Sequence, residues 1–313
     1  MRRIRSRSRL LLAGLLLGAA GLIGSASPPP ASPLEFVAVG DWGRDAAKGQ
    51  KQVAEAMGAW AGTHTLRFVV STGDNFYEYG VKSVEDPQWK TSFEDVYTAK
   101  GLQVPWLVAL GNHDYRGNVD AQVEYSRTSP RWRMPARAFT ETETLADGTR
   151  LQIFVLDTSP LLDTYRSLIS MTKVSRQDAA AQRGWLEKEL EASTAEWKIV
   201  VGHHPIYSCG PHGDSKELVR DLVPLLDRYG VALYLNGHDH GLQDLVVGGR
   251  HYVTSGAGSE LTRVAPDSRT RWAAAVNGFV AGSFTREALV LRFVDASGAV
   301  RHESTIPRPG AAR

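Results

Sequence analysis

The chain has 313 residues, of which 42% are hydrophobic and 22% charged, with 30 Gly, 15 Pro and the single Cys209. This composition excludes a disordered chain, a collagen and a small disulfide-stapled domain, and it leaves a globular protein with a sizeable core. The formal charge of +2 comes from the first 26 residues, which hold five Arg and no acid; the rest has 31 basic and 34 acidic residues. No nucleic-acid partner is therefore expected.

The first 26 residues predict a signal peptide. Five Arg precede an apolar run over residues 10–24, and small residues follow it. The run, about 15 residues, is shorter than the ~20 that a membrane-spanning helix needs, although an uncleaved anchor is the alternative. We expect cleavage near Ala26, a Pro-rich linker over 27–33, and export to the periplasm or the extracellular space without stable membrane association.

Five short apolar segments, rich in β-branched residues, predict strands that are buried on both faces. They cover residues 34–39, 66–70, 106–110, 197–201 and 231–235. Each leads into a Gly-bearing turn whose side chains can bind metals: Gly40-Asp41-Trp42-Gly43, Gly73-Asp74-Asn75, Gly111-Asn112-His113-Asp114, Gly202-His203-His204 and Gly237-His238-Asp239-His240.

Helical patterns lie between several of these segments. One covers residues 48–60, a second follows a capping Asp178, and a third opens at Ser215 with Pro224 as a break or kink. Late in the chain, two strand patterns flank the turn 295–298 and predict a hairpin. This alternation predicts a layered α/β sandwich in one domain, in which sites gather beyond the carboxyl ends of strands.

Each turn alone could have a purely structural role, because Asp and Asn form turns and a single His is commonly structural. Of the nine His, however, six lie in or near these turns, whereas His64, His251 and His302 have no such context and are expected to be structural or on the surface. His238 and His240 are two apart, so in extended chain their side chains share one side. A common metal site explains why donor side chains recur at one sheet edge.

Carboxylates and imidazoles suit first-row metal ions. Tyr77, three residues after Asp74, adds a phenolate that favours a trivalent ion such as Fe³⁺, unless it is an ordinary core Tyr. Two neighbouring metals can stabilise both the attacking and the leaving oxygen of a phosphoryl transfer, and one carboxylate should bridge them.

The ordered set of blocks resembles the purple acid phosphatases among the dinuclear metallophosphoesterases, especially their small, tartrate-resistant form. Two further stretches, 91–97 and 117–122, also look like that subgroup. The resemblance implies a β-sandwich of two mixed sheets flanked by helices, with a single domain over 34–306 and a flexible tail over 307–313. The stretch 158–177 corresponds to a family loop near the active-site mouth.

The resemblance also implies residue roles. A ferric site would use Asp41, Asp74, Tyr77 and His240. A divalent site for Fe, Zn or Mn would use Asp74, Asn112, His203 and His238, with Asp74 bridging. Catalysis would fall to His212, as general acid, and to His113. Substrate would be bound by Asn112, His113, His204 and His212.

The implied function is a secreted acid phosphatase that hydrolyses small phosphate monoesters by attack of a metal-bound hydroxide. Phosphoproteins and nucleotides are further candidate substrates. Two other functions stay open at this point: a related dinuclear phosphodiesterase or nucleotidase, and a non-catalytic metalloprotein that binds phosphate.

Overall fold

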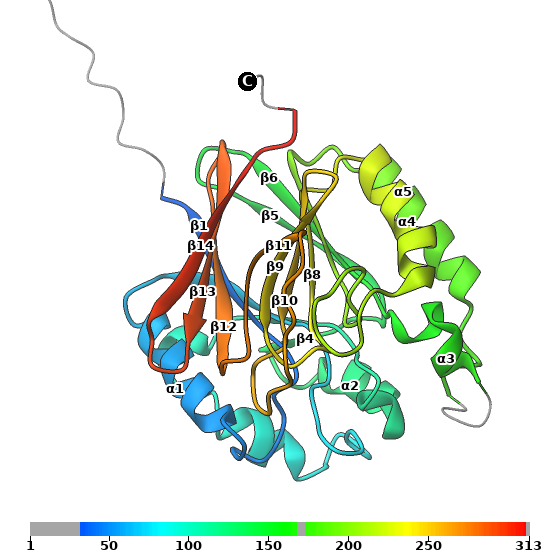
Figure 1. Ribbon diagram of the computed structural model, residues 1–313. Coiled ribbons are helices and arrows are strands. Elements are labelled where there is room, and N and C mark those ends of the chain that lie inside the picture. Colours follow the sequence, from blue (N-terminus) through cyan, green and yellow to red (C-terminus); the bar gives the residue numbers. More distant parts are fainter. Residues whose placement is uncertain (1–31, 168–172, 311–313) are drawn as a thin grey trace, which may run out of the picture. The chain divides into compact units, whose positions relative to one another are not determined.

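The computed structural model describes residues 32–167 and 173–310. The expected signal peptide, most of the linker and the end of the expected tail therefore lie outside the described residues. Two seven-stranded mixed sheets form the frame of the described chain. Figure 1 shows the two sheets facing each other, which confirms the predicted β-sandwich.

The first sheet has the strand order β14-β13-β12-β1-β2-β3-β4. Strands β1 to β4 run parallel to one another, and β12 to β14 continue the sheet in antiparallel pairing. Their bounds are β1 Leu34–Val39, β2 Leu66–Ser71, β3 Trp106–Val108, β4 Trp132–Arg133, β12 Gly278–Phe284, β13 Ala288–Asp295 and β14 Val300–Pro307.

The second sheet has the order β11-β9-β10-β8-β7-β6-β5. Strands β6, β7, β8 and β10 are parallel, with β5 and the β9–β11 pair antiparallel at the edges. Their bounds are β5 Phe139–Thr144, β6 Arg150–Val155, β7 Trp197–Val201, β8 Leu233–Asn236, β9 Leu242–Val247, β10 Arg250–Ser255 and β11 Thr270–Ala274. The five predicted strands and the late hairpin are thus confirmed.

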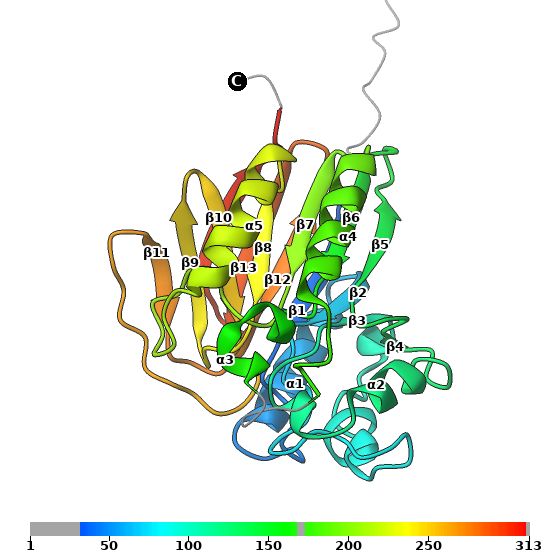
Figure 2. The same cartoon turned by 90° about the vertical axis from the view of Figure 1, so that its right-hand side faces the viewer.

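The helices are α1 Gln50–Ala61, α2 Val119–Tyr125, α3 Asp163–Arg166, α4 Ala179–Ala192 and α5 Lys216–Arg228. Figure 2 shows α4 and α5 lying over the outer face of the second sheet. One apolar core fills the space between the sheets, and a second packs Leu186, Leu190 and Leu222 of these helices against strands such as β7. Asp178 caps α4 as expected, because its carboxylate accepts the N–H of Ala181 at 2.9 Å.

The break expected at Pro224 is wrong, because α5 continues through it to Arg228. Pro224 lies on the exposed face of the helix. On the opposite face, Leu218, Leu222 and Leu226 are buried, and their packing outweighs the lost backbone hydrogen bond. None of the helices in the described ranges is long and apolar enough to cross a membrane.

A buried polar cluster joins the two sheets. The fully buried Asp244 of β9 accepts a hydrogen bond from His251 Nδ1 at 2.7 Å and, from the other sheet, hydrogen bonds from Ser304 Oγ at 2.5 Å and His302 Nε2 at 3.4 Å. Burial alone would raise the pKa of Asp244, but these partners, led by His251, lower it below its usual value. His251 and His302 are therefore structural, as expected.

Replacing this carboxylate should destabilise the fold. We expect Asp244→Asn to lower the free energy of unfolding by about 1–3 kcal/mol, because buried donors lose a charged acceptor. Since the folded pKa is depressed, the wild-type advantage should be complete above the unfolded Asp pKa of about 4 and vanish as pH falls through the folded value. Urea titrations at several pH values measure this.

The matched control is Asp120→Asn, whose side chain is 76% exposed beside Arg137 and which should unfold like wild type. Unfolding of Asp244→Asn at the wild-type midpoint would contradict the bridging role.

Candidate metal centre

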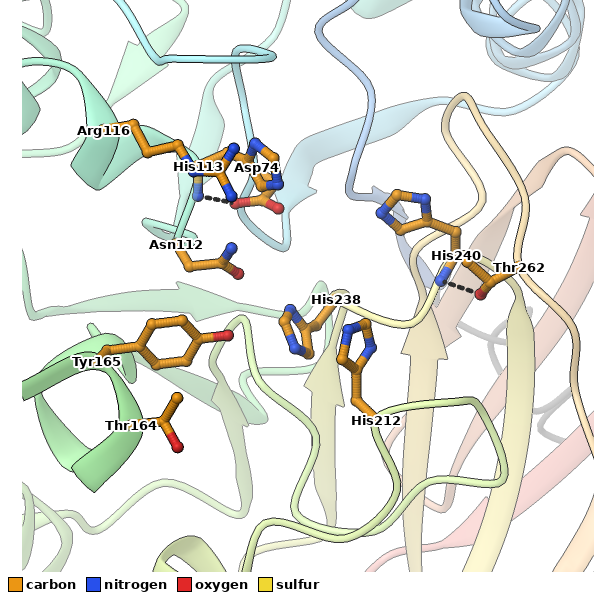
Figure 3. A pocket seen from close by; sticks show the side chains of 10 residues that line it. All are labelled: Asp74, Asn112, His113, Arg116, Thr164, Tyr165, His212, His238, His240 and Thr262. Atoms are coloured by element: carbon orange, nitrogen blue, oxygen red, sulfur yellow. Dashed lines mark hydrogen bonds between the residues drawn. The ribbon is translucent and has the colours of Figure 1, made fainter. Parts of the chain in front are cut away.

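The five Gly-bearing turns meet at one edge of the sandwich. Those after β1, β2 and β3 come from the first sheet, and those after β7 and β8 come from the second. Between them lies a pocket of about 500 Å³. Figure 3 shows its lining residues, which are Asp74, Asn112, His113, Arg116, Thr164, Tyr165, His212, His238, His240 and Thr262.

The structure brings all ten residues singled out in the sequence to this region. Six of them line the pocket directly. The other four, Asp41, Tyr77, His203 and His204, are buried and contact lining residues such as Asp74 and His238.

The backbone at three of these residues is unusual. Asp41, Asp74 and His238 have φ of 59°, 50° and 71°, in the left-handed region that non-glycine residues rarely adopt. Hydrogen bonds hold this conformation: Asp41 Oδ2 accepts the N–H of His238 at 3.0 Å, and Asp74 Oδ1 accepts the N–H of His113 at 2.8 Å. Strain of this kind is typical of functional sites.

Two glycines let the turns approach closely. A Cβ at Gly111 would lie 2.1 Å from Asp74 Oδ1, and one at Gly237 would lie 2.4 Å from Asp41 Oδ2. Either substitution would push a carboxylate out of place. Gly111 and Gly237 are therefore required by the packing of carboxylates from neighbouring turns.

Two carboxylate oxygens and a ring nitrogen surround the Tyr77 hydroxyl. It lies 3.0 Å from Asp41 Oδ1, 2.9 Å from Asp74 Oδ2 and 3.1 Å from His240 Nε2. Burial, together with the charges of Asp41 and Asp74, raises the pKa of Tyr77 well above its usual value. The phenol therefore keeps its proton until a strongly charged cation replaces it.

A second group forms around His203. Its Nε2 lies 3.1 Å from Asn112 Oδ1 and 3.2 Å from His238 Nδ1. Its Nδ1 lies 3.0 Å from the carbonyl oxygen of Thr72, which can only accept, so Nδ1 carries hydrogen. In the neutral ring the lone pair of Nε2 then faces the acceptor oxygens of Asn112 and Asp74, which favours a positive charge at this position.

In the metal-free chain, a proton supplies this positive charge. His203 Nε2 lies 3.5 Å from Asp74 Oδ2. Burial opposes the charge of both groups, but their attraction prevails: it raises the pKa of His203 to about 9 and lowers that of Asp74 below its usual range. Two overlapping groups, Asp41–Asp74–His203 and His203–His204–His238, have donor atoms within 4.8 Å of one another. The donors therefore fit metal ions, which would replace this proton.

His212 and Asp239 form a pair at the pocket wall. Asp239 is fully buried, and its Oδ1 lies 2.7 Å from Nδ1 of His212, whose side chain is half exposed. The carboxylate thus fixes the ring and leaves Nε2 for the pocket. His113 is fixed similarly, with Nδ1 2.9 Å from the carbonyl oxygen of Glu78.

Sequence reasoning missed several contributors. Asp114 is buried and accepts hydrogen bonds from Gly111 N at 2.8 Å, Gln122 Nε2 at 2.8 Å and Asn75 N at 3.1 Å, so it holds two turns together. Its place in a predicted turn was a signal for this role. Thr164 and Tyr165 line the pocket and lie in the stretch 158–177, which the resemblance places near the active-site mouth, although neither was singled out. Nothing in the sequence marked Arg116 and Thr262 as pocket residues.

Comparison with known proteins defines the class. Residues 34–242 match the family model described as Calcineurin-like phosphoesterase. Purple acid phosphatase 4 of Arabidopsis thaliana is 38% identical over 88% of this chain and 84% of the relative. Human tartrate-resistant acid phosphatase type 5 is 34% identical over 94% of this chain and 97% of the relative. The chain belongs to the purple acid phosphatases within this class, and it is accordingly a hydrolase of the phosphoric monoester type.

Two solved structures are similar in fold. The structure titled "GAP50 the anchor in the inner membrane complex of Plasmodium" has a TM-score of 0.79 at 28% identity and covers 88% of this chain and 89% of its own. Purple acid phosphatase PPD1 from yellow lupin has a TM-score of 0.64 at 20% identity, covering 91% of this chain and 56% of its own. The second likeness supports the fold alone.

Proposed function

We propose that this chain is an exported acid phosphatase that hydrolyses small phosphate monoesters at a centre of one ferric and one divalent ion. The observation that carries the proposal is the convergence of buried lone pairs from both sheets. Asp41, Asp74, Asn112, His203 and His238 bring carboxylate, amide and imidazole atoms together there, and the donor atoms of Asp41, Asp74 and His203 all lie within 4.8 Å of one another. Family membership and the basic, apolar N-terminus support the rest.

The ligands divide into two sets. The ferric ion would be held by Asp41, Asp74, Tyr77 and His240. The divalent ion, Fe, Zn or Mn, would be held by Asp74, Asn112, His203 and His238. When bound, the two ions supply positive charge that neutralises phosphate oxygens during in-line displacement.

His212 would donate the proton that the leaving group needs. Asp239 accepts the hydrogen of His212 Nδ1 at 2.7 Å, which orients the ring and leaves Nε2 for the ester oxygen. His113 and Asn112 line the same pocket and would orient the phosphate. A protonated His as the acid predicts a mildly acidic optimum.

The likeness to the Plasmodium anchor supports a second candidate, a non-catalytic protein that binds metal or phosphate. Turnover by metal-replete protein separates the two. We expect p-nitrophenyl phosphate and alkyl phosphates to be hydrolysed fastest at acidic pH, and the diester bis(p-nitrophenyl) phosphate much more slowly. Absence of turnover would favour the non-catalytic candidate, and faster diester cleavage would favour a phosphodiesterase.

Removing the Tyr77 hydroxyl tests the ferric ion. We expect iron-loaded wild-type protein to show a visible tyrosinate-to-iron absorption band that Tyr77→Phe lacks. The Phe ring can keep the packing under Arg44, whose guanidinium lies 3.8 Å from the Tyr77 ring centre. Tyr79→Phe is the matched control, because Tyr79 is 70% exposed and should leave the band unchanged. A colourless wild-type protein with full metal content would contradict the ferric assignment.

The His212 role predicts a dependence on the leaving group. His212→Ala should lower kcat by about 10²–10⁴-fold for alkyl phosphates, which need a protonated leaving oxygen, and much less for p-nitrophenyl phosphate. His64→Ala is the control, since His64 stacks on Trp60 of α1 and is not one of the residues that line the pocket. Equal losses for good and poor leaving groups would refute the assignment.

A further inference from the structure

The two adjacent histidines after β7 lie in opposite hydrogen-bonding environments. His203 Nδ1 faces a carbonyl oxygen, that of Thr72 at 3.0 Å, and therefore carries hydrogen. His204 Nδ1 instead faces a hydroxyl, Thr158 Oγ1 at 2.8 Å. A hydroxyl can donate or accept, so its other contacts decide the tautomer of His204.

Those contacts use up the acceptor capacity of Thr158. Its Oγ1 accepts the backbone N–H of His203 at 3.2 Å and that of His204 at 3.0 Å. A hydroxyl oxygen has two lone pairs and one proton, and the two N–H groups occupy both lone pairs. The remaining proton must be donated to His204 Nδ1. His204 Nδ1 is thus an acceptor, and Nε2 carries the hydrogen.

We propose that His204 is a fixed N–H donor to the bound phosphate rather than a metal ligand, and that Thr158 is the positioning residue that sets its tautomer. The inference rests on the proposed phosphatase function. A metal ion at Nε2 would need the ring hydrogen to move to Nδ1, where the Thr158 oxygen has no free lone pair to accept it. His204 is therefore excluded as a ligand although it lies in a group with His203 and His238.

The donor lacks an acceptor in the described part of the chain. His204 is 1% exposed, and its Nε2 is buried without a hydrogen-bond partner there. Such a group costs free energy until an acceptor arrives. The main chain is held in place, because the Tyr234 hydroxyl donates to the His204 carbonyl oxygen at 2.8 Å.

The neighbours of His204 indicate where the acceptor comes from. Its ring packs against His238 and Tyr165, with centroid distances of 4.5 and 4.7 Å. Both neighbours line the pocket, and Figure 3 shows the Tyr165 ring directed toward His238. An anionic oxygen of a phosphate bound at this wall is the acceptor that suits a neutral N–H held behind it.

The first test separates donor from ligand. His204→Phe keeps a ring against Tyr165 but has neither N–H nor lone pair. We expect it to retain the wild-type metal content by elemental analysis, while inorganic phosphate binds at least about tenfold more weakly by calorimetry. Loss of one metal ion per chain, or unchanged phosphate affinity, would overturn the proposal.

The second test addresses Thr158. Thr158→Val preserves shape and removes the hydroxyl, and Thr158→Ser restores it. Phosphate affinity should fall in the Val variant and recover in the Ser variant. In ¹⁵N-histidine spectra of zinc-loaded wild type, the hydrogen of the His204 ring should lie on Nε2. In Thr158→Val the hydrogen should no longer be confined to Nε2. Hydrogen on Nδ1 in the wild type would overturn the proposal.

Neither measurement requires turnover, so failure of the proposed function can be distinguished from failure of this inference. Wild-type protein that binds neither metal nor phosphate would overturn the proposed function and this inference together. Wild-type protein that binds both, with His204→Phe indistinguishable from it, would overturn this inference alone.

Discussion

The site is governed by the crowding of buried oxygen and nitrogen atoms that can all accept hydrogen bonds or bind a cation. Carboxylate oxygens of Asp41 and Asp74 lie 3.0 and 2.9 Å from the Tyr77 hydroxyl. His203 Nε2 lies 3.1 Å from Asn112 Oδ1 and 3.5 Å from Asp74 Oδ2. Buried acceptors that face one another repel unless positive charge lies between them. In the metal-free chain, protons on His203 and Tyr77 supply part of that charge, as their raised pKa values indicate. Binding of metal ions would therefore be coupled to the release of these protons.

The fold creates this crowding through the meeting of two sheets. Parallel strands place their carboxyl ends at one edge, and two facing sheets place two such edges together. The hydrogen bond from His238 N to Asp41 Oδ2 crosses between the sheets, and both residues have left-handed backbone. Separating the sheets would dismantle the site, so the core between them positions donors as well as stabilising the fold.

Much of this architecture could be predicted from the sequence, because apolar runs that end in Gly and donor residues are local patterns. Partners such as Asp239 for His212 and Thr158 for His204 could not be predicted, because they depend on how distant turns are oriented. The same limit applies to Arg116 and Thr262, which look like ordinary surface residues in the sequence. At Pro224 the local sequence predicts a break, but the packing of buried Leu residues on the other face of the helix keeps the helix continuous.

Fold alone does not decide between an enzyme and an anchor, since the fold is shared with a structure titled as an anchor. The side chains that face the pocket carry more weight. A protein that only binds partners has no need of a carboxylate buried behind His212, nor of two neighbouring histidines held in opposite tautomers. Each of these arrangements buries polar groups at a cost in stability. Under the proposed function, His212 and His204 would each direct a nitrogen at the phosphate ester. Their coexistence with the ligand set favours catalysis.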